Sequence, residues 1–90
     1  PLHEACWDGH LEVAKWLVNE CQVNPDQLNE YGESLLHAAC KGGWSGVIKW
    51  LVLECKLDPK LASKEGLYPF HFAKRVGDQE TVDLLDKLAQ

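Results

Sequence analysis

The sequence lacks the patterns that mark secreted, metal-binding and membrane proteins. Its four cysteines form no C-x-x-C pair and no N-x-S/T sequon occurs, so neither a zinc ribbon nor a secreted glycoprotein is suggested. No apolar run approaches the roughly 20 residues needed to cross a bilayer, and no charged segment followed by an apolar one opens the chain. We therefore expect a soluble protein with no membrane partner, whose thiols stay reduced inside the cell, in the cytoplasm or the nucleus.

Positive charge is also scarce. The formal net charge is −5 at pH 7, and because phosphate binding depends on clustered Lys and Arg, we expect no nucleic-acid partner. Residues 1–34 carry seven acidic side chains against one basic side chain, whereas residues 35–68 carry five lysines against three acids. One end of the chain is therefore acidic, and its middle is mildly basic.

What the sequence does contain is a tandem repeat. His3, His37 and His71 are each separated by 34 residues. The same spacing relates several other residue types: Ala5, Ala39 and Ala73; Gly9, Gly43 and Gly77; Leu17, Leu51 and Leu85; Trp16 and Trp50; Cys6 and Cys40; Cys21 and Cys55. Chance does not align so many residue types at one period, so each unit is one supersecondary element that stacks on its neighbours.

Each unit predicts two short helices. The first begins near the histidine, where Pro1 or Pro69 suits a first helical turn and Ser34 can cap free N–H groups. It ends at the repeated glycine, because a left-handed residue such as Gly43 is needed to turn into the second helix. We call the equivalent positions of the three units a column. The column of Gly42 holds charged and branched residues in the other units, so we expect Gly42→Ala to be tolerated far better than Gly43→Val.

The second helices are expected over residues 11–20, 45–54 and 79–88. Their apolar stripe has helical spacing and places Trp16 and its counterpart Trp50 in the core. After the first two of these helices, Asn24-Pro25 or Asp58-Pro59 prevents the helix from continuing, and a polar stretch with glycine suits a hairpin-like turn.

These features resemble ankyrin repeats: the motif Pro-Leu-His-x-Ala, the glycine in mid-unit and the Leu-rich second helix. The resemblance covers the whole chain and implies an all-α helical repeat solenoid with short hairpin-like loops. It implies one domain, 1–90, with units 1–34, 35–68 and 69–90, the last resembling a C-terminal cap because Asp86 replaces Val18 and Val52. Cys21 and Cys55 stand where the family usually has glycine, which leaves the loop conformation open.

Other readings of the repeated residues are weaker. Equivalent residues of stacked units lie about 10 Å apart, too far for one metal ion to bridge the histidines or for a disulfide. We expect these histidines to bond within the loop and helix start, and the cysteines to be small buried thiols. Cys6 and His10 form no convincing nucleophile and base, because Gly9 ends the helix between them. The glycine-rich stretch 41–46 lacks the ending of a P-loop. We expect no enzyme, no cofactor and no metal.

The resemblance implies that a partner protein docks on a concave face made by the hairpin tips and the ends of the first helices. Carried over by position, the partner-binding residues are Trp7, Asp8, Glu30, Tyr31, Glu33, Lys41, Lys64, Glu65, Leu67 and Arg75, with Gly42 and Val76 also at helix ends. These columns vary in chemistry while the framework columns repeat. Trp7 or Tyr31 would be an aromatic anchor ringed by charges, although Trp7 could instead cover the edge of a preceding repeat.

Two other functions stay open at this point. A small phosphorylated ligand near Lys41, Lys64 and Arg75 is one, and a purely structural spacer of a longer solenoid is the other. Because Pro1 begins in the middle of a unit, we expect the chain to belong to a longer parent protein. We expect it to be monomeric in itself.

Overall fold

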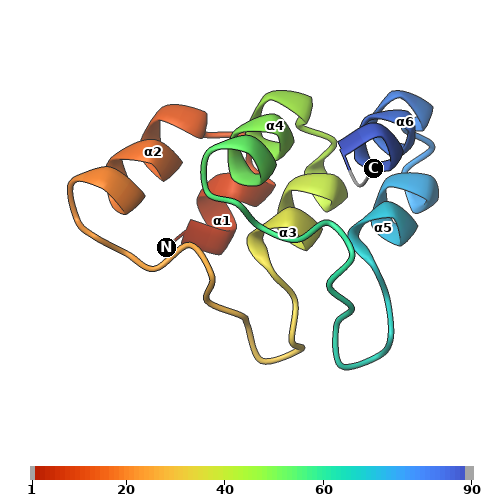
Figure 1. The fold of residues 1–90 in the computed structure, drawn as a ribbon, viewed down its shortest axis with the longest axis horizontal. Helices are drawn as coiled ribbons and strands as arrows, with labels where there is room; N and C mark the ends of the chain where they lie inside the picture. Colours follow the sequence, from red (N-terminus) through yellow and green to blue (C-terminus); the bar gives the residue numbers. More distant parts are fainter. Residues whose placement is uncertain (1, 89–90) are drawn as a thin grey trace.

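Six helices and the loops between them make up the computed structural model, which describes residues 2–88 (Figure 1). The helices are α1 (Leu2–Trp7), α2 (Leu11–Asn19), α3 (Leu35–Gly42), α4 (Ser45–Leu53), α5 (Pro69–Arg75) and α6 (Gln79–Leu88). Within these residues there is no strand, and none of the helices is long and apolar enough to span a bilayer. The predicted all-α repeat solenoid is confirmed.

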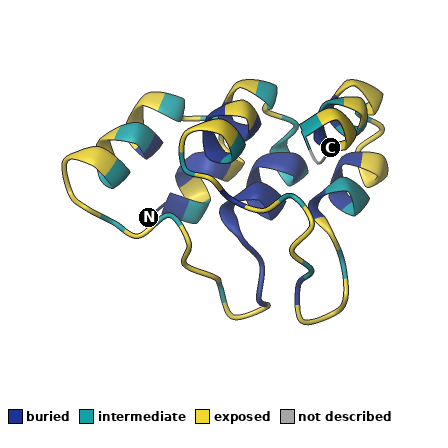
Figure 2. Ribbon diagram, in the orientation of Figure 1, coloured by how far each residue is buried: buried dark blue, intermediate teal, exposed yellow. Residues whose placement is uncertain are grey.

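The helices form two layers. The first helices of the units, α1, α3 and α5, lie side by side, α2, α4 and α6 form a second row above them in the view, and the two long loops project from the α1–α3–α5 layer (Figure 1). Stacking makes the middle unit the most buried: all residues from Leu35 to Cys40 are buried, whereas most of α2 is not (Figure 2). The core therefore follows the seams between neighbouring units, as nearest-neighbour stacking requires.

Two of the repeated histidines, His3 and His37, tie their units to the next loop. His37 is fully buried; its Nδ1 accepts a hydrogen bond from the backbone N–H of Ser34 at 3.0 Å, so its Nε2 carries the proton and donates to the carbonyl of Leu67 at 2.9 Å. His3 Nε2 lies 3.1 Å from the carbonyl oxygen of Glu33 in the same way. The structural role expected for these residues is confirmed, and it extends across the boundary between units. Burial lowers the pKa of His37, which keeps the ring neutral.

Gly43 ends α3 in the left-handed conformation, with φ of 75°, as predicted. The expectation for Gly42 is wrong. A Cβ at Gly42 would collide with the backbone oxygen of Trp7 and with the indole of Trp44. The prediction failed because it rested on the residue types at the equivalent positions of the other units. The size of residue tolerated at Gly42 is instead limited by local packing, since Trp44 occupies the adjacent space.

The sequence left open the conformation of the loops after α2 and α4, where cysteine replaces the family's usual glycine. In the structure, the residue after each of these cysteines is left-handed. Gln22 and Lys56 have φ of 56° and 60°, directly after Cys21 and Cys55. The left-handed turn after each second helix is thus made by a residue with a side chain, which costs conformational energy that glycine would not.

The structure corrects a second expectation, that Trp16 lies in the core. Trp50 is 6% exposed, as predicted for the core, but Trp16 is 56% exposed, and Val13 is 48% exposed where Val47 is 2% exposed. These two columns face the preceding unit, so they are covered on α4 and uncovered on α2.

Burial of the thiols also differs between columns. Cys6 and Cys40 are buried as predicted, whereas Cys55 is half-buried and Cys21 is exposed. All four are free thiols. The prediction of buried thiols is therefore right for the Cys6 column and wrong for Cys21, which lies beyond the last turn of α2.

Candidate functional site

A hollow of ≈ 430 Å³ lies where the hairpin tips meet the C-terminal ends of α1, α3 and α5; we call it the concave hollow. Its lining residues are Trp7, Tyr31, Glu33, Lys41, Glu65, Leu67, Phe72, Arg75 and Val76. Seven of the ten predicted partner-binding residues are in this set, and Val76 had been placed at a helix end. The structure thus brings together positions that are spread over most of the sequence.

Three predicted residues do not line the hollow. Asp8 is exposed in the turn after α1. Glu30 and Lys64 link the two hairpins instead: Lys64 Nζ donates to the carbonyl of Glu30 at 3.0 Å, and the backbone N–H of Lys64 donates to the carbonyl of Tyr31 at 3.0 Å. These contacts fix the spacing of the hairpin tips, so Lys64 shapes the hollow from outside it.

Phe72 is the lining residue that the sequence did not reveal. It is buried on α5, and its ring forms an edge contact with His37, with the ring centroids 5.6 Å apart. Its column holds Glu4 in the first unit and Ala38 in the second, so no repeated residue type marked it. The sequence held no signal for it, because only the packing shows that this column faces the preceding unit.

Lys41 and Glu33 form a fixed ion pair in the concave hollow. Lys41 Nζ lies 2.7 Å from Glu33 Oε1, which also accepts from Asn29 Nδ2 at 3.0 Å. Burial pushes the pKa of Glu33 upward, but the hydrogen bonds from Lys41 and Asn29, together with the nearby positive charge, outweigh it and lower the pKa. The carboxylate is therefore ionised near neutral pH, and its charge cancels that of Lys41.

Cations also lie over the aromatic rings. Lys41 Nζ is 4.9 Å from the ring centroid of Phe72 and 5.3 Å from that of Trp7. The guanidinium of Arg75 lies 5.5 Å from the same Phe72 centroid. These distances are within the range of cation–π attraction, which holds the three helix ends together through their side chains.

The walls of the hollow are aromatic and open to solvent. Trp7 is 53% exposed and Tyr31 is 54% exposed. The Tyr31 backbone is held by Asn29, whose Oδ1 accepts from the N–H groups of Tyr31 and Glu33, each at 2.9 Å. Large apolar side chains that are exposed on a fixed backbone are typical of binding surfaces.

The residues considered for catalysis do not form a reactive pair. Burial raises the pKa of Cys6 to about 12, so its thiol is protonated and unreactive at neutral pH, and His10 is exposed at the start of α2. Over residues 2–88, no group of three or more His, Cys, Asp or Glu side chains is arranged to hold a metal ion.

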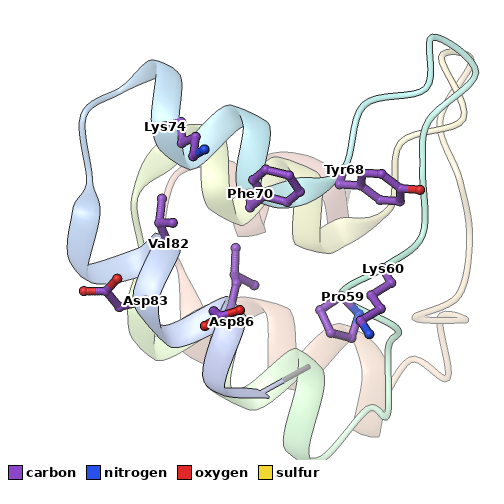
Figure 3. A pocket seen from close by; sticks show the side chains of 9 residues that line it. Pro59, Lys60, Tyr68, Phe70, Lys74, Val82, Asp83 and Asp86 are labelled. Carbon is purple, nitrogen blue, oxygen red and sulfur yellow. The ribbon is translucent and has the colours of Figure 1, made fainter. Parts of the chain in front are cut away.

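A second hollow, of ≈ 490 Å³, lies on the outer face of α5 and α6 (Figure 3). Tyr68, Phe70 and Lys74 lie on one side, with Val82, Asp83 and Asp86 opposite and Pro59 and Lys60 at one end (Figure 3). Its apolar members occupy columns that are buried in the other units: Phe70 corresponds to Leu2 and Leu36, and Val82 to Ala14 and Ile48. This hollow is therefore the stacking face of the third unit, without a neighbour in the described chain.

Comparison with known proteins adds two findings. The sequence matches the family model described as ankyrin repeats (3 copies) over residues 1–89. A chain of the solved complex between a predatory endopeptidase from Bdellovibrio bacteriovorus and an immunity protein is similar, with 28% identity and a TM-score of 0.87. The match covers 97% of this chain and 45% of that one, so this chain spans less than half of the neighbour's length. No curated protein matches the sequence.

Proposed function

This chain belongs to the ankyrin-repeat family, and from that premise we propose that it is a non-catalytic module that binds another protein in the concave hollow. The family's repeats are protein-interaction modules. The similar solved chain comes from a complex of an endopeptidase with an immunity protein, and we carry over only the class of partner, a protein. Fold alone does not supply a reaction.

One observation carries the choice of surface. In the concave hollow, Trp7 and Tyr31 are each about half exposed, and the same hollow is lined by buried Phe72 and the neutralised pair of Lys41 and Glu33. Aromatic anchors on a rigid support dominate binding energy in protein interfaces, because they bury much apolar area while losing little conformational freedom.

A phosphorylated small ligand is less well supported. Such a ligand needs convergent cations, but Lys41 is paired with Glu33 and Lys64 is bonded to Glu30 outside the hollow. Arg75 alone is left to meet a phosphate. A pure spacer would have no reason to hold exposed aromatic side chains together at a loop tip and a helix end, as Tyr31 and Trp7 are held.

The limits of the module and its surroundings are part of the same proposal. We propose one domain with units 1–34, 35–68 and 69–90, the third acting as a closing unit. Lys74 and Asp86 support this because they replace buried cysteines and half-buried valines of the other two units. The reduced thiols favour an intracellular location.

The test compares two tryptophans of similar exposure. A partner is isolated from a cell lysate with the 90-residue chain, and its Kd is measured for each variant after circular dichroism has shown that the variant is folded. We expect Trp7→Ala or Tyr31→Ala to weaken binding by about 2 kcal/mol or more, roughly 30-fold. Trp16→Ala, outside the hollow, and Lys15→Ala, on the second-helix layer, should change the Kd little. If the two controls abolish binding while the hollow variants do not, the surface is wrong.

A further inference from the structure

Two charges in the concave hollow, those of Arg75 and Glu65, form no ion pair among the described residues. Lys41 and Glu33 neutralise one another. By contrast, among residues 2–88 no acidic group lies within ion-pair distance of Arg75, and no basic group lies within that distance of Glu65. Both side chains are exposed and both line the hollow, Arg75 from the last turn of α5 and Glu65 from the second hairpin tip. The hollow therefore presents one free positive and one free negative charge from two different structural elements.

The apolar part of the hollow lies with these two charges. Trp7 and Tyr31 belong to α1 and the first hairpin, and Val76, just after α5, is also about half exposed. Phe72 and Leu67 line the same space and are largely covered. An apolar side chain from outside would remove several exposed apolar surfaces from water at once, which is the largest favourable contribution available at this site.

From this arrangement we infer the chemistry of the bound segment; the inference rests on the protein-binding function proposed above. We propose that the concave hollow receives a peptide segment with an apolar side chain packed against Trp7 and Tyr31, a carboxylate paired with Arg75 and a cation paired with Glu65. The guanidinium favours a carboxylate, because two parallel N–H donors match its two oxygens.

Charge balance decides against a highly charged partner. The lining residues Glu33, Lys41, Glu65 and Arg75 contribute two negative and two positive charges, so the hollow has no net charge to attract a polyanion or a polycation. A segment that carries one acid and one base matches both free groups, and a reversed order of charges places like charges together. The two free charges thus set the direction of the segment as well as its composition.

The first experiment uses a phage-displayed library of random 12-residue peptides, selected on the immobilised 90-residue chain. We expect enrichment of peptides that carry an acid and a base on opposite sides of an apolar residue. A representative selected peptide is then measured against variants. Arg75→Glu should weaken its binding by at least tenfold, and a fresh selection on this variant should replace the acid with a base.

The control for Arg75 is its neighbour on the same helix. Lys74→Glu makes an identical change of charge, but Lys74 lines the outer hollow on α5 and α6. It should leave the peptide affinity and the selected pattern unchanged. In the same way Glu65→Lys should weaken binding and exchange the selected base for an acid, whereas Glu80→Lys, exposed in the first turn of α6, should not.

The possible failures are distinguishable. Binding that is lost in Trp7→Ala and Tyr31→Ala but insensitive to Arg75→Glu and Glu65→Lys overturns the charge assignment and leaves the proposed function in place. Selected peptides that bind equally well to these four variants of the hollow overturn both the charge assignment and the proposed function. A library that yields no binder also overturns the inference, because peptides with one acid, one base and an apolar residue are abundant in it.

Discussion

Trp44 Nε1 donates a hydrogen bond to the backbone carbonyl of Trp7 across 2.7 Å. The indole at the start of α4 therefore closes over the turn between α1 and α2, and it fills the space beside Gly9 and Gly42. Neither glycine can gain a side chain without moving this ring. The contact ties the helix turns of two consecutive units together on the side away from the hairpin contact of Lys64 with Glu30.

The first prediction follows from this contact. Gly42→Ala should lower the free energy of unfolding by about 1–3 kcal/mol, because a Cβ there collides with backbone that cannot easily move. Gly46→Ala, in α4 with no neighbour in reach of a Cβ, should raise it by up to about 1 kcal/mol, as expected of alanine in a helix. Urea denaturation measures both, and a Gly42→Ala midpoint equal to wild type would contradict the packing of Trp44.

A second prediction concerns the left-handed residue after α4. Lys56 has φ of 60°, so Lys56→Gly should relieve strain and raise the free energy of unfolding by about 0.5–1 kcal/mol. Lys49→Gly provides the matched control, because the same replacement at an exposed position inside α4 should cost about 1 kcal/mol. Thermal melting distinguishes them; a lower melting temperature for Lys56→Gly would contradict the assigned turn.

The buried thiols predict loss of stability in alkali. Burial, with a smaller contribution from the negative charge of Asp78, raises the pKa of Cys40 from 9.0 to about 12. The unfolded chain therefore loses this proton first, and stability that is complete below about pH 9 falls as the pH rises toward 12. At about pH 10.5 the loss from Cys40 should approach 2 kcal/mol. Cys40→Ala should reduce this slope, whereas Cys21→Ala, at an exposed site, should not.

The free energy of unfolding in acid depends on His37. Burial lowers its pKa from the ordinary value of 6.5, so the unfolded chain takes up a proton at a higher pH than the folded chain. Stability from this group is complete above about pH 6.5 and is lost as the pH falls below it. Protonation would also remove the acceptor that Nδ1 offers to Ser34.

The matching measurement is urea denaturation at several values of pH between 7 and 5. His37→Asn should have a flatter dependence than wild type, because the titrating group is gone. The exposed His10→Asn variant should retain the wild-type slope. Parallel curves for His37→Asn and wild type would show that another group controls acid stability.

Most of the fold could be predicted because identical residues recur at one period. The repeated glycines, of which Gly43 is one, fixed the ends of the first helices, and the repeated histidine fixed their starts. The fate of Trp16 could not be read in this way. A column states which face of a helix a residue occupies, but burial depends on whether the adjacent unit is present to cover that face.

The candidate site was predictable to the extent that it lies at variable columns. Trp7, Tyr31 and Arg75 stood out because their columns change in chemistry while the framework repeats. Phe72 did not, because its contact with Lys41 joins two different columns of neighbouring units. Pairings of this kind depend on the rotation from one unit to the next, and the residue types at one repeated position carry no information about that rotation.

The walls of the concave hollow have separate origins in the chain: Trp7 comes from α1, Lys41 from α3, and Phe72 and Arg75 from α5. The same framework residues hold all three helices in place. Duplication or recombination that exchanges a single 34-residue unit would therefore replace one wall and keep the other two. Such a gene can acquire new binding preferences one wall at a time, without an intermediate in which the core has to be rebuilt.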